Sequence, residues 1–88
     1  MDIEKLKGVA IHCKTEKESI ECCNLADKLG YFWSTGDRFS SFNPWEDFGR
    51  ETCYNFAEGT YCDKDCCIDN GCKIHSSKWF IKNFGNNN

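Results

Sequence analysis

The sequence predicts an α+β fold: one small domain with a mostly antiparallel sheet, one long N-terminal helix and two short helices. An alternating, β-branched segment comes first, a capped helical pattern follows it, and short strand-like segments between turn residues fill the rest. Because 88 residues cannot divide their apolar side chains between two cores, we expect one domain over residues 1–84. Residues 85–88, GNNN, are expected to be a disordered tail.

The first strand is expected over residues 9–14, VAIHCK, which alternates and contains β-branched residues. Thr15 and Glu18 follow it with the spacing of a capping box, in which the hydroxyl and the carboxylate each accept from a backbone N–H. Gly30 supplies the left-handed residue that ends many helices. These signals predict a helix over residues 16–29.

One stripe of this helix is expected to face the core, because its members recur at intervals of three and four residues. Ile20 lies off the stripe and Cys23 lies at its flank. The stripe consists of Glu18, Cys22, Leu25, Ala26 and Leu29.

The remaining elements are expected to be short. A strand over residues 31–34 should return alongside the first strand, and Gly36-Asp37 should form a turn. Further strands are expected over residues 51–56, 60–62 and 72–75, with a hairpin turn at 57–59. One helical turn at 45–49 capped by Asn43, a helix over 64–69 capped by Asp63, and a last helix capped by Ser76 or Ser77 complete the chain.

The charge pattern argues against a nucleic-acid partner. The net charge is −3, and residues 36–70 hold eight acidic and three basic residues, which is a net charge of −5. Wrapping a phosphate backbone requires clustered cations, which this region lacks. A basic protein partner stays open, beside the simpler interpretation that the acids form a solvated face.

The first fourteen residues contain no apolar run long enough for a signal peptide or a membrane span, so we expect a cytoplasmic protein without a membrane partner. In a reducing compartment most of the eight cysteines should be free thiols. Disulfides and a structural zinc ion remain alternatives, although no cofactor is expected. The candidate zinc ligands are Cys62, Cys66, Cys72 and His75.

The segment over residues 31–61 holds ten of the thirteen aromatic residues and both arginines. A guanidinium beside aromatic rings can hold a phosphate and stack a base, whereas the simpler alternative pairs the arginines with local acids and buries the rings. No arrangement of the two histidines with thiols or carboxylates indicates catalysis, so we expect no enzyme. The candidate binding residues are Trp33, Arg38, Trp45, Phe48, Arg50 and Tyr54.

Over residues 9–81 the chain resembles small uncharacterised proteins of phages and mobile elements in Gram-positive bacteria. The resemblance depends on turn glycines and core aromatics, and in such relatives tyrosine is expected where Cys66, Cys67 and Cys72 stand here. The motifs are Trp33-x2-Gly36, Trp45-x3-Gly49-x2-Thr52-Cys53-Tyr54, Gly59-x-Tyr61, Gly71-x2-Ile74 and Phe80-Ile81.

This resemblance implies an anti-defence role in a host cell. Some small acidic phage proteins look like anti-CRISPR proteins, which block an effector by occupying its surface. Others look like Thoeris anti-defence proteins, which sequester a nucleotide signal. We expect the first kind, with a basic surface of a host defence protein as the partner, and we leave a homodimer open.

Overall fold

The computed structural model describes residues 6–42 and 44–85, and it confirms the predicted α+β fold. None of the helices in these residues is long and apolar enough to cross a membrane. Two short 3-10 turns, η2 (Phe39–Ser41) and η3 (Gly49–Glu51), lie on either side of α2. In chain order the other elements are β1 (Val9–His12), α1 (Glu16–Leu29), α2 (Trp45–Phe48), β2 (Thr52–Asn55), β3 (Thr60–Asp63), α3 (Lys64–Asp69), β4 (Lys73–Ser76) and α4 (Ser77–Phe84).

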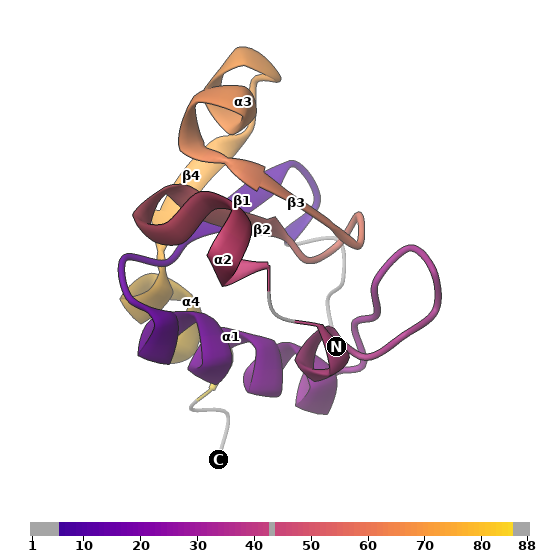
Figure 1. Ribbon diagram of the computed structural model, residues 1–88. Coiled ribbons are helices and arrows are strands. Elements are labelled where there is room, and N and C mark those ends of the chain that lie inside the picture. The colour runs from indigo at the N-terminus through magenta and orange to yellow at the C-terminus, as the bar shows by residue number, and fades with distance from the viewer. Residues whose placement is uncertain (1–5, 43, 86–88) are drawn as a thin grey trace.

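Within the described ranges the four strands form one mixed sheet in the order β3-β2-β1-β4 (Figure 1). β1 pairs antiparallel with β2, with Ile11 opposite Tyr54, and β2 pairs antiparallel with β3 through a tight hairpin. β4 runs parallel to β1, with Ala10 beside Ile74. The mostly antiparallel sheet expected from the sequence therefore has one parallel edge.

α1 occupies the predicted residues. The Glu18 backbone N–H donates to Thr15 Oγ1 over 3.1 Å, and the Glu18 carboxylate accepts from the Lys14 N–H over 3.0 Å. These bonds satisfy backbone donors at the helix start, which otherwise lack partners. Gly30 has a φ of 89° and ends the helix in the left-handed conformation.

The buried face of α1 is shifted round the helix from the predicted stripe. Cys22, Ala26 and Leu29 are buried as expected, but Glu18 and Leu25 are only half-buried. Ile20, which lies off the predicted stripe, is 48% exposed. The buried set also includes two residues next to the stripe, Ser19 and Cys23. They face the sheet, where Ser19 Oγ is hydrogen-bonded to the Tyr54 hydroxyl.

The prediction of a strand over residues 31–34 was wrong. Among the described residues this segment makes one isolated bridge, between Phe32 and Arg38, and it does not join the sheet. The Trp33 N–H donates to the Asp37 carbonyl over 2.8 Å, and the Ser34 N–H donates to the Gly59 carbonyl over 2.9 Å. Because the local turn and the β2–β3 hairpin satisfy these donors, the segment needs no strand partner.

The other predicted elements are present with small shifts of their bounds. The strand expected over 9–14 ends at His12, the one expected over 51–56 is Thr52–Asn55, and the last strand begins one residue late. Asp63 caps α3 by accepting from the Cys66 N–H over 2.7 Å, and Ser76 caps α4 by accepting from the Trp79 N–H over 3.1 Å. The proposed cap Asn43 and tail residues 86–88 lie outside the described residues.

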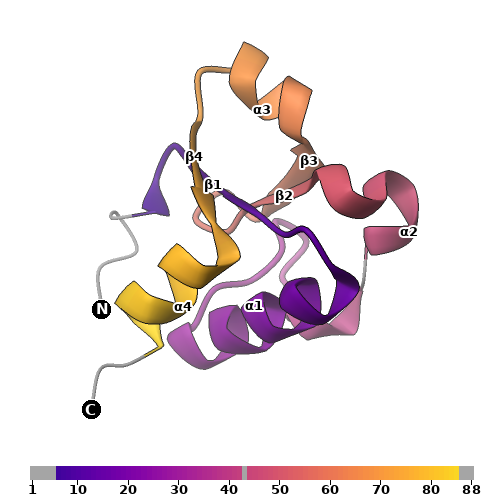
Figure 2. The same cartoon turned by 90° about the vertical axis from the view of Figure 1, so that its left-hand side faces the viewer.

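Two unequal cores lie on the two faces of the sheet. α1 and α4 pack together below the sheet and α3 lies above it, as Figures 1 and 2 show from two sides. The lower core is aromatic, with the Tyr54 and Phe56 rings stacked 5.1 Å apart and Phe80 buried against Phe56. The upper core is small and rich in sulfur: Ala10, Cys53 and Cys67, flanked by Cys62, Cys72 and Ile74.

Candidate functional site

An open pocket of about 570 Å³ lies between the loop that follows α1 and the β2–β3 hairpin. It lies within the predicted aromatic segment, and its volume falls in the range of sites that hold small molecules or a few residues of peptide. We call it the aromatic pocket. Its lining residues are Trp33, Ser34, Thr35, Asp37, Ser41, Phe42, Gly59, Thr60 and Tyr61.

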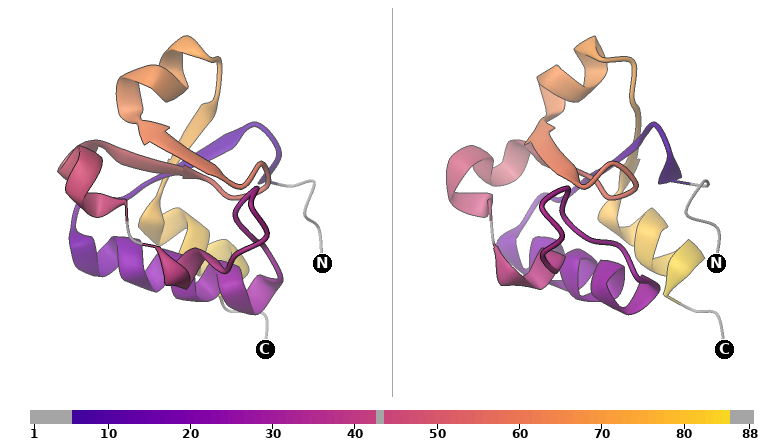
Figure 3. Two further views of the ribbon diagram at one scale, coloured as in Figure 1. Left: turned by 45° about the vertical axis from the view of Figure 1, so that its right-hand side comes forward. Right: turned by 90° about the vertical axis from the view of Figure 1, so that its right-hand side faces the viewer.

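One wall of the aromatic pocket is a tight turn. The Gly36 N–H donates to the Trp33 carbonyl over 2.7 Å, and Gly36 has a φ of 95°, a conformation that suits glycine. The bond from the Ser34 N–H to the Gly59 carbonyl ties this turn to the hairpin. The two views of Figure 3 show that this loop reaches the end of the β2–β3 hairpin.

α1 holds the second wall in place. The Asp27 carboxylate accepts from the Phe39 N–H over 2.8 Å and from the Ser40 N–H over 3.3 Å. A carboxylate is a suitable acceptor for the first N–H groups of a helical turn, which have no partner within the turn. This contact fixes η2, and Phe42 directly follows η2 at the pocket.

Three aromatic rings of the aromatic pocket contact one another. Trp33 and Tyr61 have ring centroids 5.7 Å apart, Trp33 and Phe42 are 5.9 Å apart, and Phe42 and Tyr61 are 5.8 Å apart. Phe48 extends the group, with its ring 5.8 Å from Tyr61. Phe42 is 48% exposed and Phe48 is 38% exposed, so the group is in part a surface patch.

The charge of the aromatic pocket is negative. Asp37 is the charged residue in its lining, and its carboxylate accepts from the Thr35 hydroxyl over 3.1 Å. The Tyr61 hydroxyl donates to the Asp47 carboxylate over 2.8 Å, and this hydrogen bond raises the pKa of Tyr61. Tyr61 therefore stays neutral at physiological pH, and the site offers hydroxyls, aromatic faces and a carboxylate to a ligand.

Trp33 is buried although, among the described residues, its indole N–H has no hydrogen-bond partner. Only 8% of the residue is exposed, and its indole N–H finds no acceptor among the residues that the structure describes. A buried donor left unpaired costs about 1–3 kcal/mol. Such departures from ordinary core chemistry are more frequent at functional sites than elsewhere.

The structure brings few of the predicted binding residues together. Trp33 lines the aromatic pocket and Phe48 contacts its edge through Tyr61, but Tyr54 is fully buried in the lower core. Arg38 and Arg50 are exposed, and neither lines the aromatic pocket. The remaining predicted residue, Trp45, is half-buried on α2.

Of the nine described lining residues only Trp33 was a predicted binding residue, and the eight that the sequence analysis missed include Asp37, Phe42 and Tyr61. Asp37 was interpreted as a turn residue and as a local acid that could pair with an arginine, and the two aromatics belong to the predicted segment without a pattern that distinguishes them from core residues. The places of Asp37 and Phe42 depend on the path of the loop after α1, which no periodicity encodes, whereas Tyr61 lies in β3 and lines the pocket because that loop reaches it.

The four candidate zinc ligands do not meet. In the described part of the chain, no group of three or more His, Cys, Asp or Glu side chains lies close enough to hold a metal ion. Cys62 is bonded to Cys67 in a disulfide, and His75 stacks on Trp79 with ring centroids 3.7 Å apart. Cys66 is exposed on α3 and Cys72 is half-buried before β4.

The other thiols are largely core groups. All eight cysteines lie in the described residues, and the six outside the disulfide are free, four of them buried. Burial raises the pKa of Cys23 and of Cys53 to about 12. A hydrogen bond with Cys22 raises the pKa of Cys13. These thiols remain protonated at neutral pH and are poor nucleophiles.

In comparisons with known proteins, no protein-family model, no curated protein and no solved structure matched this chain.

Proposed function

We propose that this chain is a non-enzymatic binding protein that inhibits its target by occupying a basic protein surface. In this proposal the aromatic pocket receives a lysine or arginine side chain of the partner. The observation that carries the proposal is the combination of three contacting rings with one carboxylate in a single open pocket. The resemblance to phage proteins makes a host defence effector the candidate target.

The chemistry of the pocket favours a cation. Ammonium and guanidinium groups are attracted to the faces of Trp, Tyr and Phe rings, by about 0.5–2 kcal/mol depending on desolvation. Asp37 adds a full negative charge, and the hydroxyls of Ser41 and Thr60 can accept hydrogen bonds. The same carboxylate would repel the phosphates of a nucleotide, which weighs against a nucleotide-sequestering function.

The size and surroundings of the pocket favour a protein as the source of that cation. A volume of about 570 Å³ exceeds the space needed by one side chain, so neighbouring residues of a peptide segment can enter as well. Phe42 and Phe48 present exposed rings beside it, and exposed aromatics in a polar surround are typical of interface cores. The excess of acids in residues 36–70 would also attract a basic partner.

The test is a titration of the isotope-labelled full chain with a short lysine- and arginine-rich peptide, followed by NMR. We expect shifts of the Trp33 indole N–H and of the Thr60 amide. Asp37→Asn and Phe42→Ala should each weaken binding about tenfold, the equivalent of about 1.4 kcal/mol. The matched controls are Asp69→Asn and Ile68→Ala, which change an exposed acid and an exposed apolar residue on α3, away from the pocket.

Two results would contradict the proposal. Equal weakening by the pocket variants and by the α3 controls would show that binding follows net charge rather than the pocket. The second result would come from a thermal-shift screen with cyclic and linear nucleotides. If a nucleotide stabilises the chain and the basic peptide has no effect, the sequestering function would be favoured instead.

A further inference from the structure

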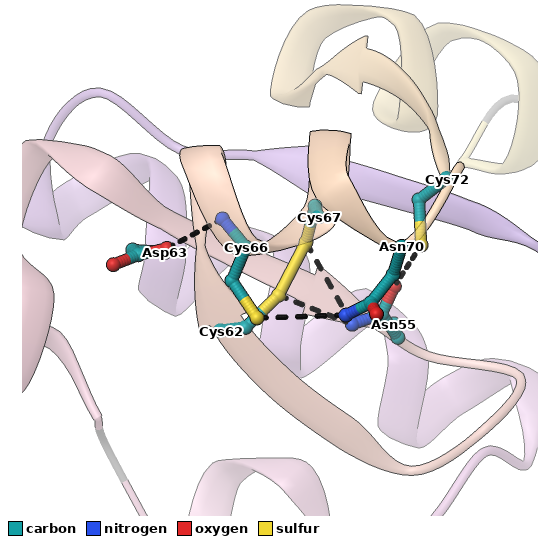
Figure 4. The surroundings of a disulfide bond; sticks show 7 residues. All are labelled: Asn55, Cys62, Asp63, Cys66, Cys67, Asn70 and Cys72. Carbon is teal, nitrogen blue, oxygen red and sulfur yellow. Dashed lines mark hydrogen bonds between the residues drawn. A yellow bond between two sulfur atoms is a disulfide. The ribbon is translucent and has the colours of Figure 1, made fainter.

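Residues 62–72 carry four cysteines above the sheet, and two of them form a disulfide. Cys62 at the end of β3 is bonded to Cys67 in α3, five positions later. Two free thiols flank this bond: Cys66, which is exposed, and Cys72, which is half-buried. Figure 4 shows the disulfide with both thiols and with the side chain of Asn55 beside it.

Asn55 contacts both bonded sulfurs. Its Nδ2 lies 3.7 Å from Cys62 Sγ and 3.9 Å from Cys67 Sγ, and its Oδ1 accepts from the Cys72 thiol over 3.6 Å. A disulfide sulfur carries no hydrogen and can only accept, so the amide N–H₂ faces the bond. Asn55 is 8% exposed, and its donors are therefore held in place before any charge develops on the sulfurs.

The two sulfurs differ in their access to solvent. Cys67 is fully buried, whereas Cys62 is half-buried. A thiolate attacks a disulfide at one sulfur, and the choice depends on which sulfur it can reach and on how well the other is stabilised as it leaves. Access favours attack on Cys62, and the Asn55 N–H₂, 3.9 Å from Cys67 Sγ, can donate to Cys67 as the leaving group.

We propose that the Cys62–Cys67 pair is a thiol–disulfide exchange site at which a low-molecular-weight thiol of the glutathione class forms a mixed disulfide with Cys62. The incoming thiolate forms a sulfur–sulfur bond with Cys62 Sγ while the Cys62–Cys67 bond breaks. The electron pair of the broken bond leaves on Cys67 Sγ, where the Asn55 N–H₂ donates to the new thiolate.

A second thiol completes the reduction. Its thiolate attacks the sulfur of the bound small thiol and releases the oxidised small-molecule disulfide together with the Cys62 thiolate. Two small thiols thus supply the two electrons that convert the protein disulfide to two thiols, and the protons that they lose are balanced by protonation of Cys62 and Cys67. Cys66 takes no part in these steps, although it is the more exposed cysteine.

The first experiment locates the mixed disulfide. The folded full chain is incubated with reduced glutathione, quenched with acid, alkylated and mapped by mass spectrometry. We expect the glutathione adduct on Cys62 and an alkylated thiol on Cys67. An adduct on Cys66 or Cys67, or a purified chain that lacks the Cys62–Cys67 bond, would overturn the proposal. Cys66→Ser is the matched control and should leave the adduct on Cys62 unchanged.

The second experiment tests Asn55 as a positioning residue. Asn55→Leu keeps a similar volume and removes the donor, so the folded variant should be reduced about tenfold more slowly, because the Cys67 thiolate loses a hydrogen bond to its charged sulfur. In concentrated urea the variant and the parent should react at equal rates. Equal rates in the folded state would overturn the role of Asn55, whereas the position of the adduct in the parent chain tests the site independently of this variant.

Discussion

At the scale of single residues, Gly59 permits the close contact between the β2–β3 hairpin and the loop after α1 that forms the aromatic pocket. A Cβ atom at this position would lie 2.5 Å from the Ser34 nitrogen and 2.8 Å from the Phe32 carbonyl oxygen. Both contacts are with backbone, which cannot rotate away as a flexible side chain can. Gly59 also has a φ of 74°, so glycine is required for its conformation as well as for its lack of volume.

Gly59→Ala should therefore separate the two walls of the pocket. We expect a loss of about 3 kcal/mol in the free energy of unfolding, from left-handed strain of about 1–2 kcal/mol and overpacking of about 1–3 kcal/mol. Gly71→Ala is the control, because Gly71 has a similar φ of 76° and a Cβ atom there would meet nothing within 4 Å. This control should lose only about 1 kcal/mol, from the left-handed strain alone. Equal losses in urea denaturation would contradict the close approach.

The sequence could locate the aromatic pocket only to a segment. The density of aromatics between residues 31 and 61 predicted a binding region, and of the residues named there Trp33 lines the aromatic pocket and Phe48 contacts its edge. Tyr54 does neither, because its place in β2 turns its ring into the lower core. Whether an aromatic faces the core or the solvent in an irregular loop depends on distant contacts such as Ser34 with Gly59, which local patterns do not contain.

At the scale of elements, Glu18 joins the starts of two helices. Besides the Lys14 N–H, its carboxylate accepts from the Ser77 hydroxyl at the start of α4 over 2.9 Å. The hydrogen bond from the Lys14 backbone lowers the pKa of Glu18 from its usual 4.5. A capping box recognised from local spacing thus also fixes how α4 meets α1, a contact between residues 59 positions apart.

The lowered pKa of Glu18 predicts a pH-dependent contribution to stability. Since the folded pKa lies below the unfolded one, the contribution is complete above about pH 4.5 and is lost as the pH falls through the folded pKa. At pH 7, Glu18→Gln should lower the free energy of unfolding by about 0.5 kcal/mol. The difference from the parent should vanish in strong acid. Glu21→Gln, at an exposed position in α1, is the control, and a constant difference from pH 7 to pH 2 would contradict the prediction.

Helices with side-chain caps were predictable, whereas pairing of the first strand was not. Thr15, Asp63 and Ser76 each accept from a backbone N–H three residues ahead, a contact set by local sequence. The strand predicted over residues 31–34 failed because its three consecutive aromatics resemble a strand, whereas the Trp33 and Ser34 N–H groups donate to the Asp37 and Gly59 carbonyls rather than to a neighbouring strand. β1 instead pairs with β2 and β4, which come much later in the chain.

At the scale of the whole molecule, the sheet separates a large aromatic core from a small sulfur-rich one. α1 and α4 bury Phe39, Tyr54, Phe56 and Phe80 on one side. On the other side α3 contributes one buried residue, Cys67, and its Ile68 is 55% exposed. Because apolar burial is the main source of stability, packing stabilises α3 less than it stabilises α1. The disulfide contributes additional stabilisation that holds α3 on the sheet.

Reduction of the Cys62–Cys67 bond should therefore loosen α3 without unfolding the rest. A disulfide that closes a loop of this length contributes about 2 kcal/mol in the chain-entropy model, a factor of roughly 30 in an opening equilibrium. We expect amide hydrogen exchange in residues 64–69 to accelerate by about that factor in the presence of a strong dithiol, while the slowest amides of α1 keep their rates. A chain carrying both Cys62→Ser and Cys67→Ser should show the fast exchange with or without the dithiol. If the amides of α1 and α3 accelerate together, the two faces of the sheet form one cooperative unit, and the upper core does not open independently.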